Sequence, residues 1–141
     1  MFLNATRMRY STDCGIAALA TATGKAWDAC SLNLIGKGSY FVTPETYCGV
    51  TQYQMQLGIA TLMLWDETMP SGAPLTSAKG QRGVVLVRVE HAELEGQRHW
   101  LAWEKDEHGR VWLYNPTDGE VFRAESMTGR GFYQLCHFTI A

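Results

Sequence analysis

The sequence has few of the features that would place it in a membrane, on nucleic acid or in a disulfide framework. None of its apolar runs approaches the length that crosses a bilayer. Its 12 basic residues are scattered among 14 acidic ones, and the net charge is −2, so no basic surface for nucleic acid or anionic lipid is predicted. We therefore expect neither a nucleic-acid partner nor a membrane partner.

Cysteine is sparse for a disulfide scaffold, with four in 141 residues and no CxxC spacing. Residues 1–10 lack the apolar core and the charge order of a secretory signal. Both observations predict a cytoplasmic protein with reduced thiols. With 46% hydrophobic residues the chain can form one core, so we expect a single domain over residues 1–141. The sequence does not indicate an oligomeric state.

Helical patterns occupy the first half of the chain. Three helices are predicted, each ended by a glycine: 14–23 with Gly24, 28–35 with Gly36, and 43–57 with Gly58. A strand is predicted at 59–65. The segment 69–81, which is rich in proline and glycine, is expected to be a surface loop beside a cleft.

Strand patterns dominate the second half. Four segments are rich in β-branched or aromatic residues: 84–89, 99–103, 111–114 and 132–140. Their succession predicts a meander of antiparallel strands, and helices followed by strands indicate an α+β fold. The helix at 14–23 is apolar and alanine-rich, so we expect it to be buried and packed on the sheet.

Cys14 lies where residues 11–13, which we expect to form a hydrogen-bonding cap, give way to an apolar helix. The free N–H groups and the positive dipole end of a helix favour thiolate over thiol, which makes Cys14 a candidate nucleophile. Gly15 would let a substrate backbone approach the sulfur without meeting a side chain. The other cysteines are predicted to be structural: Cys30, Cys48 and Cys136.

A cysteine nucleophile needs a base, usually an imidazole that a third polar side chain orients. Among the histidines, His91 and His108 fall in polar turns, and His137 lies inside the last strand pattern. His99 opens a strand directly after a polar stretch, where a side chain can reach the edge of a sheet. We therefore predict that His99 is the base.

Asn115 is the predicted partner of His99, because the two strands that carry them form a hairpin pattern. If Lys105 lies opposite Gly109, residue 99 faces residue 115, with Cβ atoms roughly 5 Å apart. A slip of one residue would turn the two side chains to opposite faces. Asp118 is an alternative orienting residue.

Trp100 is a candidate substrate contact together with Gly15, although an aromatic residue in a strand also suits a sheet core. No metal site is predicted, since structural zinc sites show paired ligands and Cys136-His137 is the one adjacent pair. Thiolate and imidazole can carry out an acyl transfer by themselves, so we expect no cofactor.

Taken together, Asp13-Cys14-Gly15 entering an alanine-rich helix, His99 at a strand start and Asn115-Pro116 at the end of the next strand resemble the papain-like cysteine peptidases. The likeness covers most of the chain. It is greatest to the peptidase domains of bacteriocin-exporting transporters, in which a DCG-type motif opens the central helix. The resemblance implies a Cys-bearing helix on an antiparallel sheet, a peptide or protein substrate, and a bacterial or phage origin.

One part of the family's pattern is missing from this chain. Papain-like enzymes usually carry a glutamine before the cysteine that helps to bind the oxyanion, whereas Arg7-Met8-Arg9-Tyr10 stands there in this sequence. Asn4 or Thr12 are the candidate replacements, beside the backbone N–H of Cys14. Related acyl transfers use the same groups. The alternative hypothesis is an inactive papain-like protein that binds a host protein as an inhibitor or effector.

Overall fold

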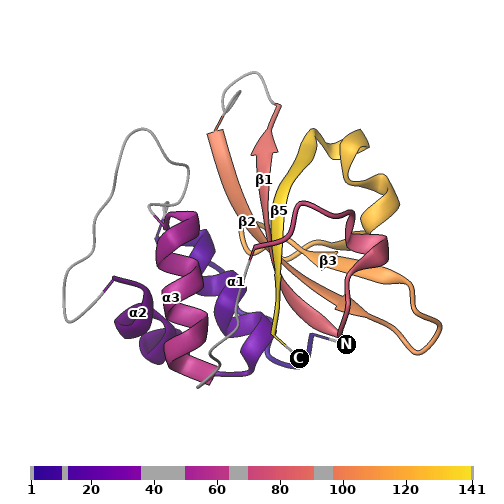
Figure 1. Ribbon diagram of the computed structural model, residues 1–141. Helices are drawn as coiled ribbons and strands as arrows, with labels where there is room; N and C mark the ends of the chain where they lie inside the picture. Colours follow the sequence, from indigo (N-terminus) through magenta and orange to yellow (C-terminus); the bar gives the residue numbers. More distant parts are fainter. Residues whose placement is uncertain (1, 11–12, 36–49, 64–69, 91–96, 141) are drawn as a thin grey trace.

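The computed structural model describes residues 2–10, 13–35, 50–63, 70–90 and 97–140. Within these ranges the elements are α1 (Cys14–Thr23), α2 (Trp27–Ile35), α3 (Gln52–Met63), β1 (Arg82–Val89), β2 (Gln97–Lys105), β3 (Val111–Tyr114), β4 (Val121–Arg123) and β5 (Phe132–Thr139), with short 3-10 turns at Leu75–Ser77, Ala124–Ser126 and Thr128–Arg130. The five strands form one antiparallel sheet with the helices gathered on one side of it, which confirms the α+β class (Figure 1). No helix in the described ranges is long and apolar enough to cross a membrane.

Helix α1 packs directly on β1 and β2, and α2 packs on both α1 and α3. Every α1 residue from Cys14 to Ala22 is buried, as the apolar pattern predicts. The helix ends where Gly24 adopts a left-handed conformation, with φ at +75°, and donates its N–H to Ala20 O at 3.0 Å. The predicted bounds of this helix are therefore confirmed.

Helix α3 corrects two predictions about the segment that follows residue 50. The helix runs unbroken through Gly58, which we expected to end it, and residues 59–63 are helical where a strand was predicted. The predicted start of this helix at residues 43–45 lies outside the described residues.

A capping box and a buried face explain α3. Thr51 Oγ1 accepts the N–H of Gln54 at 3.1 Å, and Gln54 Oε1 accepts the N–H of Thr51 at 2.8 Å. Met55, Gly58 and Ile59 recur at helical spacing and are all buried. The packing of this face outweighs the low helix propensity of a single glycine.

The sheet order is β4-β3-β2-β1-β5, so the predicted meander is wrong at its last strand. Strands β1 to β4 pair in succession, and β5 then returns to pair with β1. After the short β4, which was not predicted, the 3-10 turns carry the chain across one face of the sheet. Met127, between these turns, is buried in one apolar cluster with Val85, Leu101 and Leu113, so the crossing covers an apolar face of the sheet.

Side chains alternate between the two faces of the sheet, so the sheet separates two hydrophobic cores. The face toward the helices buries Val84, Leu86, Trp100, Ala102 and Phe138 with α1. The opposite face buries Val85, Val87, Leu101, Trp103 and Leu113 with Leu75 and Met127. Both faces of the sheet are therefore covered, and a residue's parity in β2 decides which core it enters.

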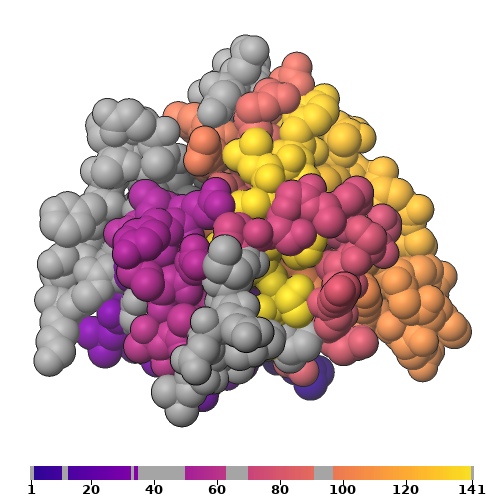
Figure 2. Space-filling view, in the orientation of Figure 1, coloured from indigo at the N-terminus to yellow at the C-terminus, as the bar shows by residue number. Residues whose placement is uncertain are grey.

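The segment 70–81 lies over β5 and covers its outer edge (Figure 2). Ser71 and His137 exchange two backbone hydrogen bonds of 2.9 Å. A pocket of about 330 Å³ lies under this segment, lined by Ser71, Ala73, Ser77, Ala78, Lys79, His137 and Thr139. The predicted surface loop is thus present and borders a pocket.

Gly83 offers a sharp test of the β1–β5 pairing. A Cβ atom at this position would lie 1.8 Å from Phe138 O and 2.7 Å from Trp103 Nε1. We expect Gly83→Ala to lower the free energy of unfolding by about 3 kcal/mol or more, since the strands must separate to admit the methyl group. Denaturant unfolding measures this. Gly72→Ala, with no atom within 4 Å of its Cβ, is the control, and equal losses in both variants would contradict the packing.

Candidate active site

His99 and Asn115 come together, but in a register that differs from the predicted one. Lys105 lies opposite Val111 and not opposite Gly109, a displacement of two residues. Because side chains alternate with a period of two, this displacement keeps His99 and Asn115 on one face, as diagonal neighbours. His99 Nε2 and Asn115 Oδ1 are 2.8 Å apart.

Asp106 sets this register by organising the loop between β2 and β3. Its Oδ1 accepts the backbone N–H groups of His108 and Arg110, both at 2.9 Å. Its Oδ2 accepts Arg110 Nε at 2.9 Å and Trp112 Nε1 at 3.0 Å. Gly109, with φ at +77°, provides the left-handed residue inside the loop. Five residues thus form the turn, which lengthens it relative to the prediction.

The amide of Asn115 has a defined orientation. Its Oδ1 accepts the backbone N–H of Thr117 at 3.1 Å, so the atom that faces His99 is the oxygen and Nε2 donates. Asp118, the alternative orienting residue, is exposed and its Oδ1 accepts the N–H of Glu120 at 2.9 Å. The side chain that lies next to the imidazole is therefore that of Asn115.

His99 is only 1% exposed, which differs from the predicted position at a sheet edge. Phe132 stacks on its ring with the centroids 6.0 Å apart. Burial lowers the pKa of His99 from its ordinary value to about 4, against the opposing effects of the Asn115 hydrogen bond and the charge of Asp118. The ring is therefore neutral at pH 7, with its proton on Nε2 and the buried Nδ1 as its basic nitrogen.

The sulfur of Cys14 meets β2 directly beside His99. Strand β3 ends at Tyr114, so its pairing with β2 begins only at Ala102. The N–H of Trp100, two residues earlier, donates to Cys14 Sγ at 3.4 Å. Covalent geometry then keeps the sulfur within about 6 Å of the Cα of His99. The start of α1 and the strand that carries His99 thus meet at one point, beyond the end of β3.

Asp13 does not act as the predicted side-chain cap of α1. Its fully buried carboxylate accepts the backbone N–H groups of Arg9 and Tyr10, both at 2.9 Å, and Trp27 Nε1 at 2.7 Å. Residues 11–12, the rest of the predicted cap, lie outside the described residues. Asp13 therefore anchors the segment that leads into the helix, which positions Cys14 from outside the helix.

Gly15 and Trp100, the predicted substrate contacts, are both interior residues. A Cβ on Gly15 would lie 2.8 Å from Val50 Cβ and 3.0 Å from Trp100 Cδ1. Trp100 is fully buried and its Nε1 donates to Val50 O at 2.9 Å. Glycine at position 15 permits this close packing, and the contact of both residues with a substrate stays a prediction.

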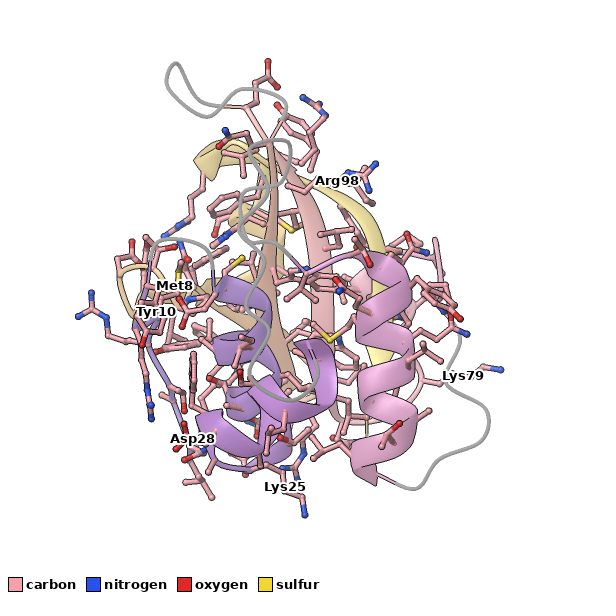
Figure 3. All side chains as sticks on the ribbon, turned by 90° about the vertical axis from the view of Figure 1, so that its left-hand side faces the viewer. Met8, Tyr10, Lys25, Asp28, Lys79 and Arg98 are labelled. Atoms are coloured by element: carbon pink, nitrogen blue, oxygen red, sulfur yellow. The ribbon has the colours of Figure 1, made fainter. Side chains whose placement is uncertain are left out.

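Asn4, one of the two candidates for the missing glutamine, does not lie beside Cys14. Asn4 Nδ2 donates to Ala20 O at 3.0 Å and to Lys25 O at 3.1 Å, at the other end of α1. Thr12 lies outside the described residues. Met8 and Tyr10 belong to the segment where the family carries its glutamine. Figure 3 shows them well separated from Lys25, to which Asn4 is hydrogen-bonded.

The remaining residues for which the sequence makes a prediction are cysteines and histidines. Cys30 and Cys136 are buried, and burial raises the pKa of both thiols, that of Cys30 to about 11. His108 is exposed in its turn and His137 is buried within β5, as expected. Cys48 and His91 lie outside the described residues. Within the described ranges, no three side chains of His, Cys, Asp or Glu gather as metal ligands would.

Thr117 is a site residue that the sequence did not reveal. Its Oγ1 lies 3.3 Å from His99 Nε2 and donates to Met8 Sδ at 3.3 Å. The sequence feature that could have indicated Thr117 is Asn115-Pro116-Thr117, because an Asn side chain often accepts the backbone N–H two residues later. That pattern predicts a turn but says nothing of the contact with an imidazole 18 residues earlier.

Comparison of the chain with protein-family models and with curated proteins gave no match. The site is therefore characterised by its geometry alone. A thiol at a helix start lies against the peptide that joins His99 to Trp100, and a neutral imidazole is held by an amide.

The buried neutral imidazole makes stability depend on pH. The unfolded chain binds a proton at residue 99 near pH 6.5, whereas the native protein does so only near pH 4. The contribution of His99 to the free energy of unfolding is therefore fully present above about pH 6.5 and is lost as the pH drops to 4, a change of about 3 kcal/mol. Urea unfolding at several pH values measures this slope.

His99→Gln cannot titrate at this position and should reduce the slope between pH 6.5 and 4, leaving the part that comes from His137, whose pKa burial also lowers. His108→Gln removes an exposed histidine instead and should leave the slope as it is. An equal slope in the His99 variant and the wild type would show that the folded imidazole is not held neutral.

Proposed function

We propose that this chain is a papain-like cysteine hydrolase that acts as a peptidase, with Cys14 as nucleophile, His99 as base and Asn115 as the orienting residue. One observation carries the proposal. The sulfur that begins α1 lies against the backbone beside His99, while the Nε2 of that histidine donates to Asn115 at 2.8 Å. The same three residue types in this order motivate the resemblance in the sequence.

The mechanism follows from the position of the proton on the His99 ring. Because Nε2 keeps its proton for Asn115, Nδ1 removes the thiol proton as Cys14 Sγ attacks the substrate carbonyl carbon. The tetrahedral adduct collapses to a thioester when Nδ1–H protonates the leaving amine. Water then gives a proton to Nδ1 and attacks the thioester, which releases the carboxylic acid and restores the thiol. The backbone N–H of Cys14 stabilises the oxyanion.

A second candidate function is a papain-like binding protein without turnover. The observation that favours it is the burial of the site. Cys14 has no exposed surface, and Asn4 is engaged far from the sulfur. Turnover requires a local opening that admits a peptide to Cys14, whereas binding to a host protein does not. The two functions differ in the reactivity of the sulfur.

Alkylation by iodoacetamide at neutral pH tests the nucleophile. We expect Cys14 to react at least about tenfold faster than Cys30 and Cys136, whose raised pKa values leave little thiolate at pH 7. Mass mapping of the modified peptides gives each rate. Cys14→Ser serves as the control and should lack the fast phase. If Cys14 reacts no faster than the other two, the binding function replaces the peptidase.

Asn115→Ala tests the orienting residue in an assay of peptide cleavage. We expect kcat/KM to fall at least about tenfold, because the imidazole loses the acceptor that fixes its proton on Nε2. Asp118→Ala removes a nearby charge but no hydrogen bond to the ring, and should change kcat/KM by less than about threefold. The opposite ranking of the two variants would assign the orienting role to Asp118.

A further inference from the structure

We infer that Thr117 is a positioning residue of this site, which holds Asn115 and His99 in the arrangement that keeps the imidazole proton on Nε2. The inference rests on the proposed function, since it concerns the base of the same reaction. Three sets of contacts support it, and they involve different atoms of the residue.

The backbone N–H of Thr117 orients the amide. It donates to Asn115 Oδ1 at 3.1 Å, across the intervening Pro116. If the amide turned over, its NH₂ group would face both this N–H and the ring nitrogen, and a donor would meet a donor. The turn therefore presents an oxygen to His99 before any substrate binds.

The hydroxyl of Thr117 provides a second acceptor for the ring proton. Its hydrogen is directed to Met8 Sδ at 3.3 Å, so a lone pair of Oγ1 is available to Nε2, 3.3 Å away. The ring N–H is thus shared between Asn115 Oδ1 at 2.8 Å and this hydroxyl. A proton held by two acceptors stays on Nε2, which leaves Nδ1 as the base.

Backbone contacts join the turn to the segment that precedes the nucleophile. The N–H of Met8 donates to Pro116 O at 3.0 Å, and Arg7 Nη2 donates to Thr117 O at 3.1 Å. Residues 9–10 of the same segment are held by Asp13, the residue before Cys14. Thr117 therefore stands where the orienting amide, the base and the lead-in to the nucleophile meet.

Thr117→Val tests the hydroxyl, because valine keeps the shape and the backbone N–H but has no Oγ1. We expect Cys14 alkylation to slow by about threefold to tenfold, the range for one neutral hydrogen bond. In NMR spectra the Nε2–H resonance of His99 should exchange with water faster than in the wild type. Thr117→Ser retains the hydroxyl and should restore both. Thr76→Val, at an exposed threonine in the 3-10 turn Leu75–Ser77, is the control.

Thr117 is exposed, so the valine variant should fold, and its melting temperature verifies this. A wild-type alkylation rate in Thr117→Val overturns the inference. A slower rate with an unchanged ring proton also overturns it, since the effect would then bypass His99. If Cys14 is unreactive in the wild type, the proposed function fails, while the ring proton still reports whether Thr117 holds the imidazole.

Discussion

The close packing of α1 on β1 and β2 is the constraint on which the rest of the structure depends. Alanine and glycine along the helix bring its backbone near the sheet, and Gly15 fits against Val50 and Trp100 with no room for a Cβ. This approach delivers the first residue of the helix, Cys14, to the N–H of Trp100. A larger residue at position 15 would move the sulfur away from the strand that carries His99.

The end of β3 is equally important, because it opens the place that Cys14 occupies. At Asn115-Pro116 the chain turns away from β2. The N-terminal part of β2 therefore has β1 on one side and the start of α1 on the other. Asn115, which directly follows the last residue of β3, also supplies the amide for His99. One short turn thus ends a strand, opens space for the sulfur and orients the imidazole.

Burial gives the imidazole its chemical character. The protein keeps His99 neutral by desolvation, and the hydrogen bond to Asn115 opposes that effect only in part. A neutral ring with its proton on Nε2 suits a base that accepts a proton during the proposed reaction. The same burial encloses Cys14, so peptidase activity and binding without turnover place different demands on how the site opens.

Local sequence signals determined much of this protein. They include the glycine that ends α1, the bounds of β3 and the shared face of His99 and Asn115, which depends on parity alone. Tertiary structure decided the rest. Gly58 remains helical because its face is buried, and the Asp106 loop displaces the hairpin by two residues. Likewise, β5 pairs with β1, and Trp100 enters the core. These outcomes depend on contacts between segments distant in sequence, whose packing energy exceeds local preference.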